Sequence, residues 1–409
     1  MGSMIKLSFI GDILIQREQL RAIRIADRYD FDVIFERING IFDKSDYVCG
    51  NLETPVADLK IAPYTKSGGV FNTPIEILGA LRRLGVNFLS TANNHCLDSG
   101  IEGAMQTHRA VVAHGFDTSG INLSANRNET IVIREIGGIR CAFLAYTYGT
   151  NSENIGACMI PDEQWWLINL YKKQASTSPS FNFKNRMRYM YKAWAPFPMQ
   201  SWYWRNKIVK TIRPVADSVP DSEVHNSNNA VYLNRFSSDL QSAKHRVDTV
   251  FLLSHCGGQY NDTPAAYTRF ISDFAITHGA THVIASHPHC SQAIRLSQGN
   301  ITAWSLGNFC SWPGAMLDVP GCLSEYSYVL HLYLSKETKT VQKITVSPLV
   351  SAFSVGDRIA RIWKLDDKIK TEHSVDVRRK LESDKVKLFF RLSCAKYTDA
   401  GDGEYQIEG

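Results

Sequence analysis

Five short apolar runs in this 409-residue chain each end in a cluster of Gly, Asn, Asp or His, and this recurrence constrains the fold more than any other feature. The runs with their polar ends span 5–12, 46–53, 86–95, 249–255 and 282–289. Between them lie amphipathic, helix-like segments at 75–84, 102–113, 231–246 and 265–277. Alternating strands and helices indicate a layered α/β fold, in which the loops after the strands converge at one edge. We therefore expect the five polar clusters to lie close together.

The composition is that of a globular protein without a membrane span or a disulfide framework. Hydrophobic residues make up 44% of the chain and charged residues 21%. No window reaches the roughly 18 uninterrupted apolar residues of a membrane span, and no secretory signal is recognisable. The nine cysteines include no Cys-x-x-Cys, which argues for a reducing compartment. These features favour a cytoplasmic location.

The stretch 164–213 differs from the rest of the chain because it holds ten Lys and Arg, no Asp or Glu, and twelve aromatic residues. Without those ten bases the net charge of the chain would change from +5 to −5, so the basic character is local. Three interpretations remain open: an aromatic cap on the body, a binding surface for an extended anionic substrate, or a contact with a membrane surface or nucleic acid. No nucleic-acid motif is present, so no nucleic-acid partner is expected.

We predict one main domain over 4–335, with an insertion at 160–230 that acts as a cap or a substrate-binding element. A C-terminal extension over 336–409 is expected to pack on this domain. Its last residues, 400–409, are rich in Gly, Asp and Glu and are expected to be frayed. Oligomeric state does not follow from the sequence.

The polar residues at the strand ends form a set that suits a divalent metal. They are Asp12, Glu53, Asn94, His255, His287 and His289. Mixed oxygen and imidazole ligands favour Mn, Fe or Zn over Mg or Ca. Six ligands exceed the needs of one catalytic ion and are about right for two ions that share a carboxylate. His95, beside Asn94, would face the substrate as a proton donor.

Each of these residues also has an ordinary structural explanation. Asp12 could cap a helix, Glu53 could be a surface carboxylate, and His255 could be a hydrogen-bonded core histidine. Pro288 is expected to hold His287 in extended geometry, so that the two imidazoles leave a strand end at fixed spacing. The collective position of the six residues at strand ends favours the metal site.

Other catalytic classes find little support. No Gly-x-Ser-x-Gly elbow is present, so Ser254 and Ser286 beside histidines are interpreted as incidental. There is no phosphate-binding loop and no complete Gly-x-Gly-x-x-Gly. The cysteines near the polar motifs are interpreted as small apolar fillers rather than catalytic thiols; they are Cys96, Cys256, Cys290 and Cys310.

The motifs resemble, in order, those of bacterial capsule-synthesis proteins of the CapA type, which are associated with poly-γ-glutamate synthesis. The resemblance covers roughly 5–312 and rests on Gly11-Asp12, Asn51-Leu52-Glu53, Asn93-Asn94-His95-x-x-Asp98-x-Gly100, Ser254-His255-x-Gly257, His287-Pro288-His289-x-x-Gln292 and Ser305-Leu306-Gly307-Asn308-Phe309. This family belongs to the calcineurin-like metallophosphoesterase superfamily, which implies a four-layer α/β/β/α sandwich.

The resemblance implies specific roles for the site residues. Asp12 and His289 would bind the first metal, Glu53 would bridge, and the second metal would be bound by Asn94, His255 and His287. His95 would be the general acid, with Asp98 as a second catalytic residue. Substrate contacts are predicted for Arg17, Asn93, Gln259 and Asn308.

Three positions depart from the pattern of the relatives. Many superfamily members have a histidine where this chain has Leu14, which implies a thinner shell around the first metal. Cys256 and Gln259 replace the Trp and Glu that are usual in the capsule family.

The function predicted on these grounds is a metal-dependent hydrolase that uses metal-bound hydroxide on an anionic small-molecule or polymer substrate. The substrate would be a phosphoester, or an amide of a glutamyl-type polymer or peptide, with a link to capsule or poly-γ-glutamate metabolism. The cofactors would be one or two divalent ions (Mn, Fe or Zn). The alternative is a non-catalytic polymer-binding or assembly factor, which Leu14 and the basic stretch would favour. Contact of 164–213 with a membrane surface is a weaker hypothesis.

Overall fold

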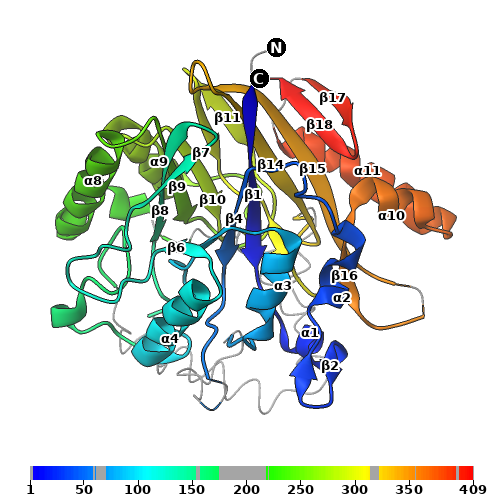
Figure 1. The fold of residues 1–409 in the computed structure, drawn as a ribbon, viewed down its shortest axis with the longest axis horizontal. Helices are drawn as coiled ribbons and strands as arrows, with labels where there is room; N and C mark the ends of the chain where they lie inside the picture. The colour runs from blue at the N-terminus through cyan, green and yellow to red at the C-terminus, as the bar shows by residue number, and fades with distance from the viewer. Residues whose placement is uncertain are drawn as a thin grey trace.

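The computed structural model describes residues 3–58, 60, 71–152, 157–174, 218–219, 221–313, 322–354, 356–392 and 396–408. Within these residues the chain is a mixed α/β protein built around two large mixed sheets (Figure 1). The α/β class predicted from the alternation of strands and helices is therefore confirmed. A separate pair of short strands, β2 (Arg24–Ile25) and β3 (Arg28–Tyr29), forms a small hairpin.

The first sheet has ten strands and is centred on β1 (Met4–Ile13). Its order is β17-β18-β15-β14-β1-β4-β5-β6, with β13 paired to β1 and β16 paired to β15. β1 runs parallel to β4 and antiparallel to β14. The bounds of the other strands are β4 (Tyr47–Leu52), β5 (Phe88–Ser90), β6 (Asp117–Ser119), β13 (Asn308–Cys310), β14 (Tyr326–Ser335), β15 (Val341–Phe353), β16 (Ala360–Lys364), β17 (Lys396–Gly401) and β18 (Glu404–Glu408).

The second sheet has six strands in the order β11-β12-β10-β9-β8-β7. Its central strands β8, β9 and β10 are parallel, and both edges carry an antiparallel pair. The bounds are β7 (Val132–Ile136), β8 (Ile139–Thr147), β9 (Thr249–His255), β10 (His282–Ser286), β11 (Ile294–Ser297) and β12 (Asn300–Ala303).

Apolar clusters hold the layers together. Between the two sheets, Phe9 meets Phe251 and Phe88 meets Phe143, with ring centroids 5.3 and 5.5 Å apart. A second cluster joins helices α2 and α3 to the outer face of the first sheet, and a third joins α8 and α9 to the outer face of the second (Figure 1). Full burial of a large apolar side chain contributes about 1.5–3 kcal/mol to the free energy of folding. These interfaces are therefore the main source of stability.

The four amphipathic segments predicted as helices are confirmed as α3, α4, α8 and α9. Two of them end at glycines in the left-handed region, Gly85 (φ 103°) and Gly279 (φ 126°), where other residues would be strained. The helix bounds are α1 (Arg17–Ala22), α2 (Asp32–Phe35), η1 (Glu36–Ile38), α3 (Glu76–Leu84), α4 (Gly100–Ala113), η2 (Asp162–Gln164), η3 (Asp221–His225), η4 (Ser227–Asn229), α8 (Ala230–Lys244), α9 (Ala266–His278), α10 (Leu365–Thr371) and α11 (Val375–Arg391). No helix among the described residues is long and apolar enough to cross a bilayer.

The C-terminal part differs from its prediction. The expected boundary after residue 335 falls between β14 and β15, which are antiparallel neighbours in one sheet. The tail expected to be frayed contains β18, which pairs with β15 and β17, so that expectation is wrong. Tyr405 and Ile407 of β18 are buried in the core between the sheets, and this apolar contact explains why the tail is held. Of the basic stretch 164–213, residues 175–213 lie outside the described residues.

Candidate metal centre

The carboxyl ends of β1, β4, β9 and β10 bring the predicted ligands to one place. Asp12 of β1 lies opposite Asn51 of β4, and His255 of β9 lies opposite Ser286 of β10. Gly11 allows the close approach of the loop before β13, because a Cβ there would lie 1.9 Å from the carbonyl oxygen of Gly307. The backbone N–H of Asp12 donates to that same oxygen at 3.1 Å. The converging strand ends predicted from the sequence thus form one buried cluster.

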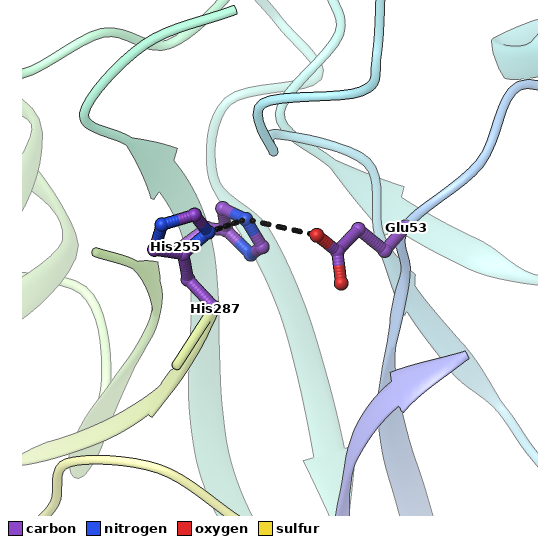
Figure 2. Close-up of side chains that lie close together, drawn as sticks. All are labelled: Glu53, His255 and His287. Carbon is purple, nitrogen blue, oxygen red and sulfur yellow. Dashed lines mark hydrogen bonds and ion pairs between the residues drawn. The ribbon is translucent and has the colours of Figure 1, made fainter. Parts of the chain in front are cut away.

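One group of ligand atoms comes from Glu53, His255 and His287 (Figure 2). His255 Nε2 lies 3.5 Å from Glu53 Oε1 and 3.1 Å from His287 Nδ1. Asn94 Oδ1 lies 2.8 Å from the same nitrogen. Three nitrogen or oxygen atoms therefore lie close to His255 Nε2, and one small ligand could contact all four atoms.

A second group comes from Asp12, Glu53 and His289. His289 Nδ1 lies 3.4 Å from Asp12 Oδ2, and His289 Nε2 lies 3.7 Å from Glu53 Oε1. Glu53 belongs to both groups, as a carboxylate shared by two ions would. All of these side chains are buried.

Glu53 shows that the cluster fits a cation. Its carboxylate is fully buried, and neither oxygen has a hydrogen-bond partner among the described residues. Burial, together with the nearby Asp12 carboxylate, raises the pKa of Glu53 well above its ordinary value. A buried acceptor without a hydrogen-bond partner lowers the stability of the fold by about 1–3 kcal/mol or more. Such a group therefore indicates a bound ligand. These buried His, Asp and Glu groups could bind a metal ion.

His255 and His287 are held in the neutral form that a metal ligand requires. Burial lowers the pKa of His255 and of His287 well below the ordinary value, and the neighbouring histidines lower it further. The backbone is also unusual here, because His287 has φ 106° and His289 has φ 57°. The expectation that Pro288 keeps His287 extended is therefore wrong. The backbone N–H of His287 donates to Asp12 Oδ2 at 3.2 Å, and this bond holds the strained turn.

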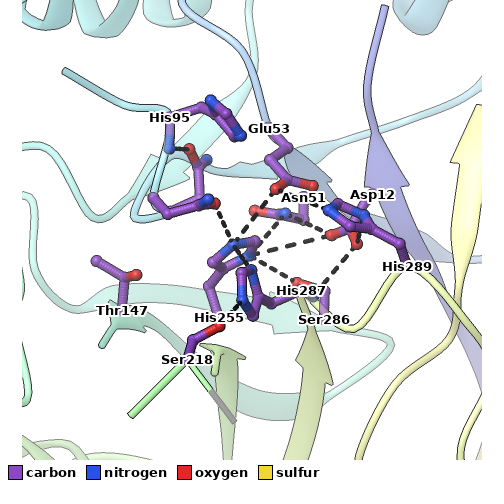
Figure 3. A network of polar contacts seen from close by, with 12 residues as sticks. Asp12, Asn51, Glu53, His95, Thr147, Ser218, His255, Ser286, His287 and His289 are labelled. Carbon is purple, nitrogen blue, oxygen red and sulfur yellow. Dashed lines mark hydrogen bonds and ion pairs between the residues drawn. The ribbon is translucent and has the colours of Figure 1, made fainter. Parts of the chain in front are cut away.

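Neutral oxygens also contact a ring nitrogen of each histidine, and Figure 3 shows two of the residues that supply them, Ser286 and Ser218. His255 Nδ1 lies 3.2 Å from Ser286 Oγ, and His287 Nε2 lies 2.8 Å from Ser218 Oγ. His289 Nδ1 lies 3.0 Å from Asn308 Oδ1. Such outer partners fix the orientation of an imidazole ligand.

His95 lies beside the cluster (Figure 3) and forms a pair with Asp98. His95 Nδ1 is 2.8 Å from Asp98 Oδ2, which also accepts from the backbone N–H of Phe71 at 2.8 Å. The Phe71 ring packs edge-on against the imidazole at 4.7 Å between centroids. Asn93 Oδ1 accepts from the His95 backbone N–H, while its Nδ2 donates to Leu52 O at 2.7 Å. The imidazole is thus held on several sides.

The four predicted substrate contacts have different surroundings. Asn93 and Asn308 are buried and their amide groups hold neighbouring backbone and His289, so these contacts support a positioning role. Gln259 is partly exposed in the turn after β9. Arg17 is exposed at the first residue of α1, and no described hydrogen bond joins it to the cluster. Their substrate contacts stay predictions.

The structure also shows the surroundings of the residues that depart from the family pattern. Leu14 is 2% exposed, and its backbone N–H donates to Cys310 O at 3.2 Å. Cys256 packs in the apolar cluster under α8 and α9. The eight described cysteines are buried. All of this agrees with cysteines as apolar fillers.

Three residues of the site were missed by sequence reasoning. Asn51 Nδ2 donates to Asp12 Oδ1 at 2.8 Å and lies 3.2 Å from His255 Nδ1. Alternation along β4 places Asn51 and Glu53 on the same face, so the spacing contained this signal. Ser286 was interpreted as incidental, yet it contacts His255. Ser218 carried no signal, because its contact with His287 spans 69 residues.

Comparison with known proteins gives one family match. A family model described as "Bacterial capsule synthesis protein PGA_cap" matches residues 6–312. The chain is 23% identical over 305 residues to "Capsule biosynthesis protein CapA" of Bacillus anthracis, covering 74% of this chain and 59% of that protein. It is 23% identical over 303 residues to "PGA biosynthesis protein CapA" of Bacillus subtilis (strain 168), covering 74% and 62%. The match therefore spans about three fifths of the length of these curated relatives.

Solved structures of similar architecture include a "novel phosphatase" of Mycoplasma pneumoniae, with TM-score 0.41 and 14% identity over 86% of this chain and 95% of that one. A "Putative 5'-Nucleotidase" of Staphylococcus aureus has TM-score 0.42 and 10% identity over 93% of this chain and 58% of that one. Both TM-scores lie below 0.5.

Proposed function

This chain belongs to the PGA_cap family of bacterial capsule synthesis proteins, and from that premise we propose that it is a metal-dependent hydrolase acting on an anionic substrate. The observation that carries the proposal is the carboxylate of Glu53, which is fully buried, unpartnered and shared by two groups of ligand atoms. Stability alone does not account for such a group, because burying it without a partner is unfavourable.

The contacts support the following ligand roles. Glu53 would bridge the two groups, with Asn94, His255 and His287 on one side and Asp12 and His289 on the other. The mixed oxygen and imidazole donors favour Mn, Fe or Zn. Bound ions of this kind lower the pKa of a water molecule and polarise the substrate. Leu14 leaves the side of Asp12 and His289 with fewer ligands, so we expect the weaker ion there.

His95 is the proposed proton donor to the leaving group. Asp98 accepts from its Nδ1, so the opposite nitrogen of the ring is the one left to face a substrate. The bond from Phe71 N to the same carboxylate keeps Asp98 in place. General acid catalysis by a positioned imidazole typically contributes about 10²–10⁴-fold to a rate.

The substrate class is proposed as a phosphoester, or an amide of a glutamyl-type polymer or peptide. The names of the two curated relatives refer to capsule biosynthesis and to PGA biosynthesis, and they support a link to capsule or poly-γ-glutamate metabolism. The two sheets with helices on their outer faces suit the four-layer sandwich of metallophosphoesterases. The domain limits, a cytoplasmic location and the partners of 164–213 remain part of the proposal.

A second candidate function is a non-catalytic polymer-binding or assembly factor. The observation that favours it is Leu14, which occupies the position of a ligand histidine in many relatives with an apolar, buried side chain. A centre that lost one ion could still bind an anionic polymer through the other.

Metal analysis and activity screening separate the two candidates. Purified protein should contain Mn, Fe or Zn by elemental analysis, or take it up on addition. It should then hydrolyse at least one phosphomonoester, phosphodiester or glutamyl amide in a metal-dependent way. His95→Ala should abolish that turnover while circular dichroism and metal content stay unchanged. Metal uptake with no turnover would favour the binding factor, and no metal uptake would refute the proposed centre.

A further inference from the structure

A serine from the segment that follows the basic stretch reaches the cluster. Ser218 Oγ lies 2.8 Å from Nε2 of His287. The adjacent Val219 is 1% exposed and packs in the apolar cluster of Tyr148, Tyr171 and Phe236. Burial of Val219 therefore fixes the backbone that carries the serine. Figure 3 shows Ser218 on the side of His287 away from Glu53.

We propose that Ser218 is a positioning residue that holds His287 with Nδ1 toward the cluster. The proposal rests on the proposed metal centre for its functional consequence. A neutral imidazole carries one proton, and the serine hydroxyl can accept it from Nε2. Nδ1 then keeps its lone pair, and this nitrogen lies 3.1 Å from His255 Nε2. A hydroxyl can also donate, which would place the proton on Nδ1; acceptance by Ser218 is the arrangement that leaves Nδ1 able to bind a metal.

Other contacts of His287 fix its backbone but not the tautomer of its ring. Its backbone N–H bonds to Asp12 Oδ2, and the ring of Tyr148 packs against it at 4.7 Å between centroids. The aromatic contact is compatible with either tautomer. At the ring nitrogens themselves His287 has two contacts, His255 Nε2 at Nδ1 and Ser218 Oγ at Nε2, and the tautomer is set between them.

The other two histidines have outer partners at the ends of the strands themselves. Ser286, beside His255, ends β10, and Asn308, beside His289, begins β13. Ser218 instead comes from the predicted insertion at 160–230. The inserted segment thereby contributes an outer contact to the centre, in addition to any role in covering it.

The first test uses the metal-free protein and NMR of the histidine ring nitrogens. Wild type should show His287 as the tautomer protonated at Nε2. Ser218→Ala should show a mixture of tautomers or the opposite one, and Ser218→Thr, which keeps the hydroxyl, should restore the wild-type spectrum. Ser222→Ala is the matched control, since Ser222 is exposed four residues further along in η3. An unchanged His287 spectrum in a folded Ser218→Ala protein would overturn the proposal.

The second test measures Mn²⁺ binding by isothermal titration calorimetry. Removal of an outer partner typically lowers metal affinity about 10- to 100-fold. Since the serine is neutral, we expect a loss of about 10-fold for Ser218→Ala, and a change below about 2-fold for Ser218→Thr and Ser222→Ala. Equal affinity in wild type and Ser218→Ala would contradict a positioning role. If wild type binds no Mn²⁺, the proposed function fails, and the tautomer spectra still decide the role of Ser218.

Discussion

Strand β1 contributes to two buried polar clusters, and they differ in how their polar atoms are partnered. The Glu53 cluster lies at its carboxyl end and comprises Asp12, Asn51, Glu53, Asn94, His255, His287 and His289. The Lys6–Glu404 cluster lies toward its start and comprises Lys6, Ser8, His331, Tyr333, Thr345, Ser347 and Glu404. The first holds a fully buried glutamate and buried histidines, and the second holds a partly buried glutamate and a buried histidine. Only the second gives each of these groups a protein partner.

In the Lys6–Glu404 cluster the glutamate is paired on both oxygens. Oε1 of Glu404 pairs with Lys6, and Oε2 accepts from Tyr333 at 2.9 Å and from Thr345 at 2.8 Å. Burial acts to raise the pKa of Glu404, but His331 and Lys6 lower it to about 2. The pKa of Glu53 shifts in the opposite direction. The comparison teaches that a buried carboxylate stabilises the fold where the protein itself supplies its partners, and indicates a ligand where it does not.

Replacing each glutamate with glutamine tests the difference between the two clusters directly. Glu53→Gln should have the largest effect. Loss of the shared carboxylate should lower metal-dependent turnover by about 10³-fold or more, because several kcal/mol of transition-state stabilisation are lost. The free energy of unfolding should stay within about 1 kcal/mol, because the carboxyl that is replaced has no hydrogen-bond partner to lose. Turnover and urea unfolding of the same preparation check both parts. Strong destabilisation by Glu53→Gln would show that the carboxylate has a structural role after all.

Glu404→Gln should have the converse effect. It leaves Lys6 buried without its charge partner, which costs about 3 kcal/mol. Turnover per folded molecule should be unchanged, since the Lys6–Glu404 cluster holds none of the proposed ligands. Urea unfolding gives the stability and active-site titration gives the folded fraction. If Glu404→Gln lowered turnover without lowering stability, the two clusters would not differ in the way described.

Metal addition tests which of the two clusters binds the ion. Mn²⁺ at 100 times its dissociation constant should raise the free energy of unfolding of wild type by about 2.7 kcal/mol. Glu404→Gln should gain the same amount, whereas Glu53→Gln should gain little. Thermal unfolding with and without Mn²⁺ and with EDTA measures the difference. Equal gains in all three proteins would place the ion elsewhere.

Acid is expected to destabilise the protein through His331 of the Lys6–Glu404 cluster. Burial lowers the pKa of His331 to about 3. Between pH 6.5 and 3 the unfolded chain therefore binds a proton at this residue that the folded chain does not, and stability falls as the pH falls. Glu404, with its lowered pKa, adds to the loss only below about pH 4.3.

His331→Gln tests this assignment in the metal-free protein. Between pH 6 and 4 the variant should lose about 1.4 kcal/mol less per pH unit than wild type, because one proton no longer distinguishes the folded from the unfolded chain. Urea unfolding at three pH values measures the slope. A slope equal to that of wild type would mean that His331 is not a source of acid sensitivity.

The sequence made the strand ends and their ligands predictable for a physical reason. Parallel strands carry their polar ends to one edge, so apolar runs that end in Asp12, His255 or His287 imply convergence without knowledge of the contacts. The helices were equally visible, because their apolar faces repeat at helical spacing. These are local patterns, and the structure confirms the elements that they predicted.

The features that escaped prediction depend on partners far away in the chain. Lys6 and Glu404 are 398 residues apart, and a Gly-rich tail gives no sign of the strand that its pairing with β15 creates. Ser218 belongs to a segment without a local sequence pattern, and only its contact with the His287 ring indicates a role for it. The turn at His287 was misjudged because a tertiary hydrogen bond to Asp12 outweighs the local preference that Pro288 imposes.

The pairing of β1 with β14 also has a consequence for how the protein is made. Ser8 pairs with His331, which the ribosome adds 323 residues later. At about 5–20 residues per second, β1 waits roughly 15–60 s before its antiparallel neighbour exists. During that time a strand whose side chains are almost all buried in the folded protein has one edge exposed, and such edges recruit other chains. The nascent chain is therefore a natural client for chaperones, and its yield should depend on them more than that of a protein whose first strand pairs with its second.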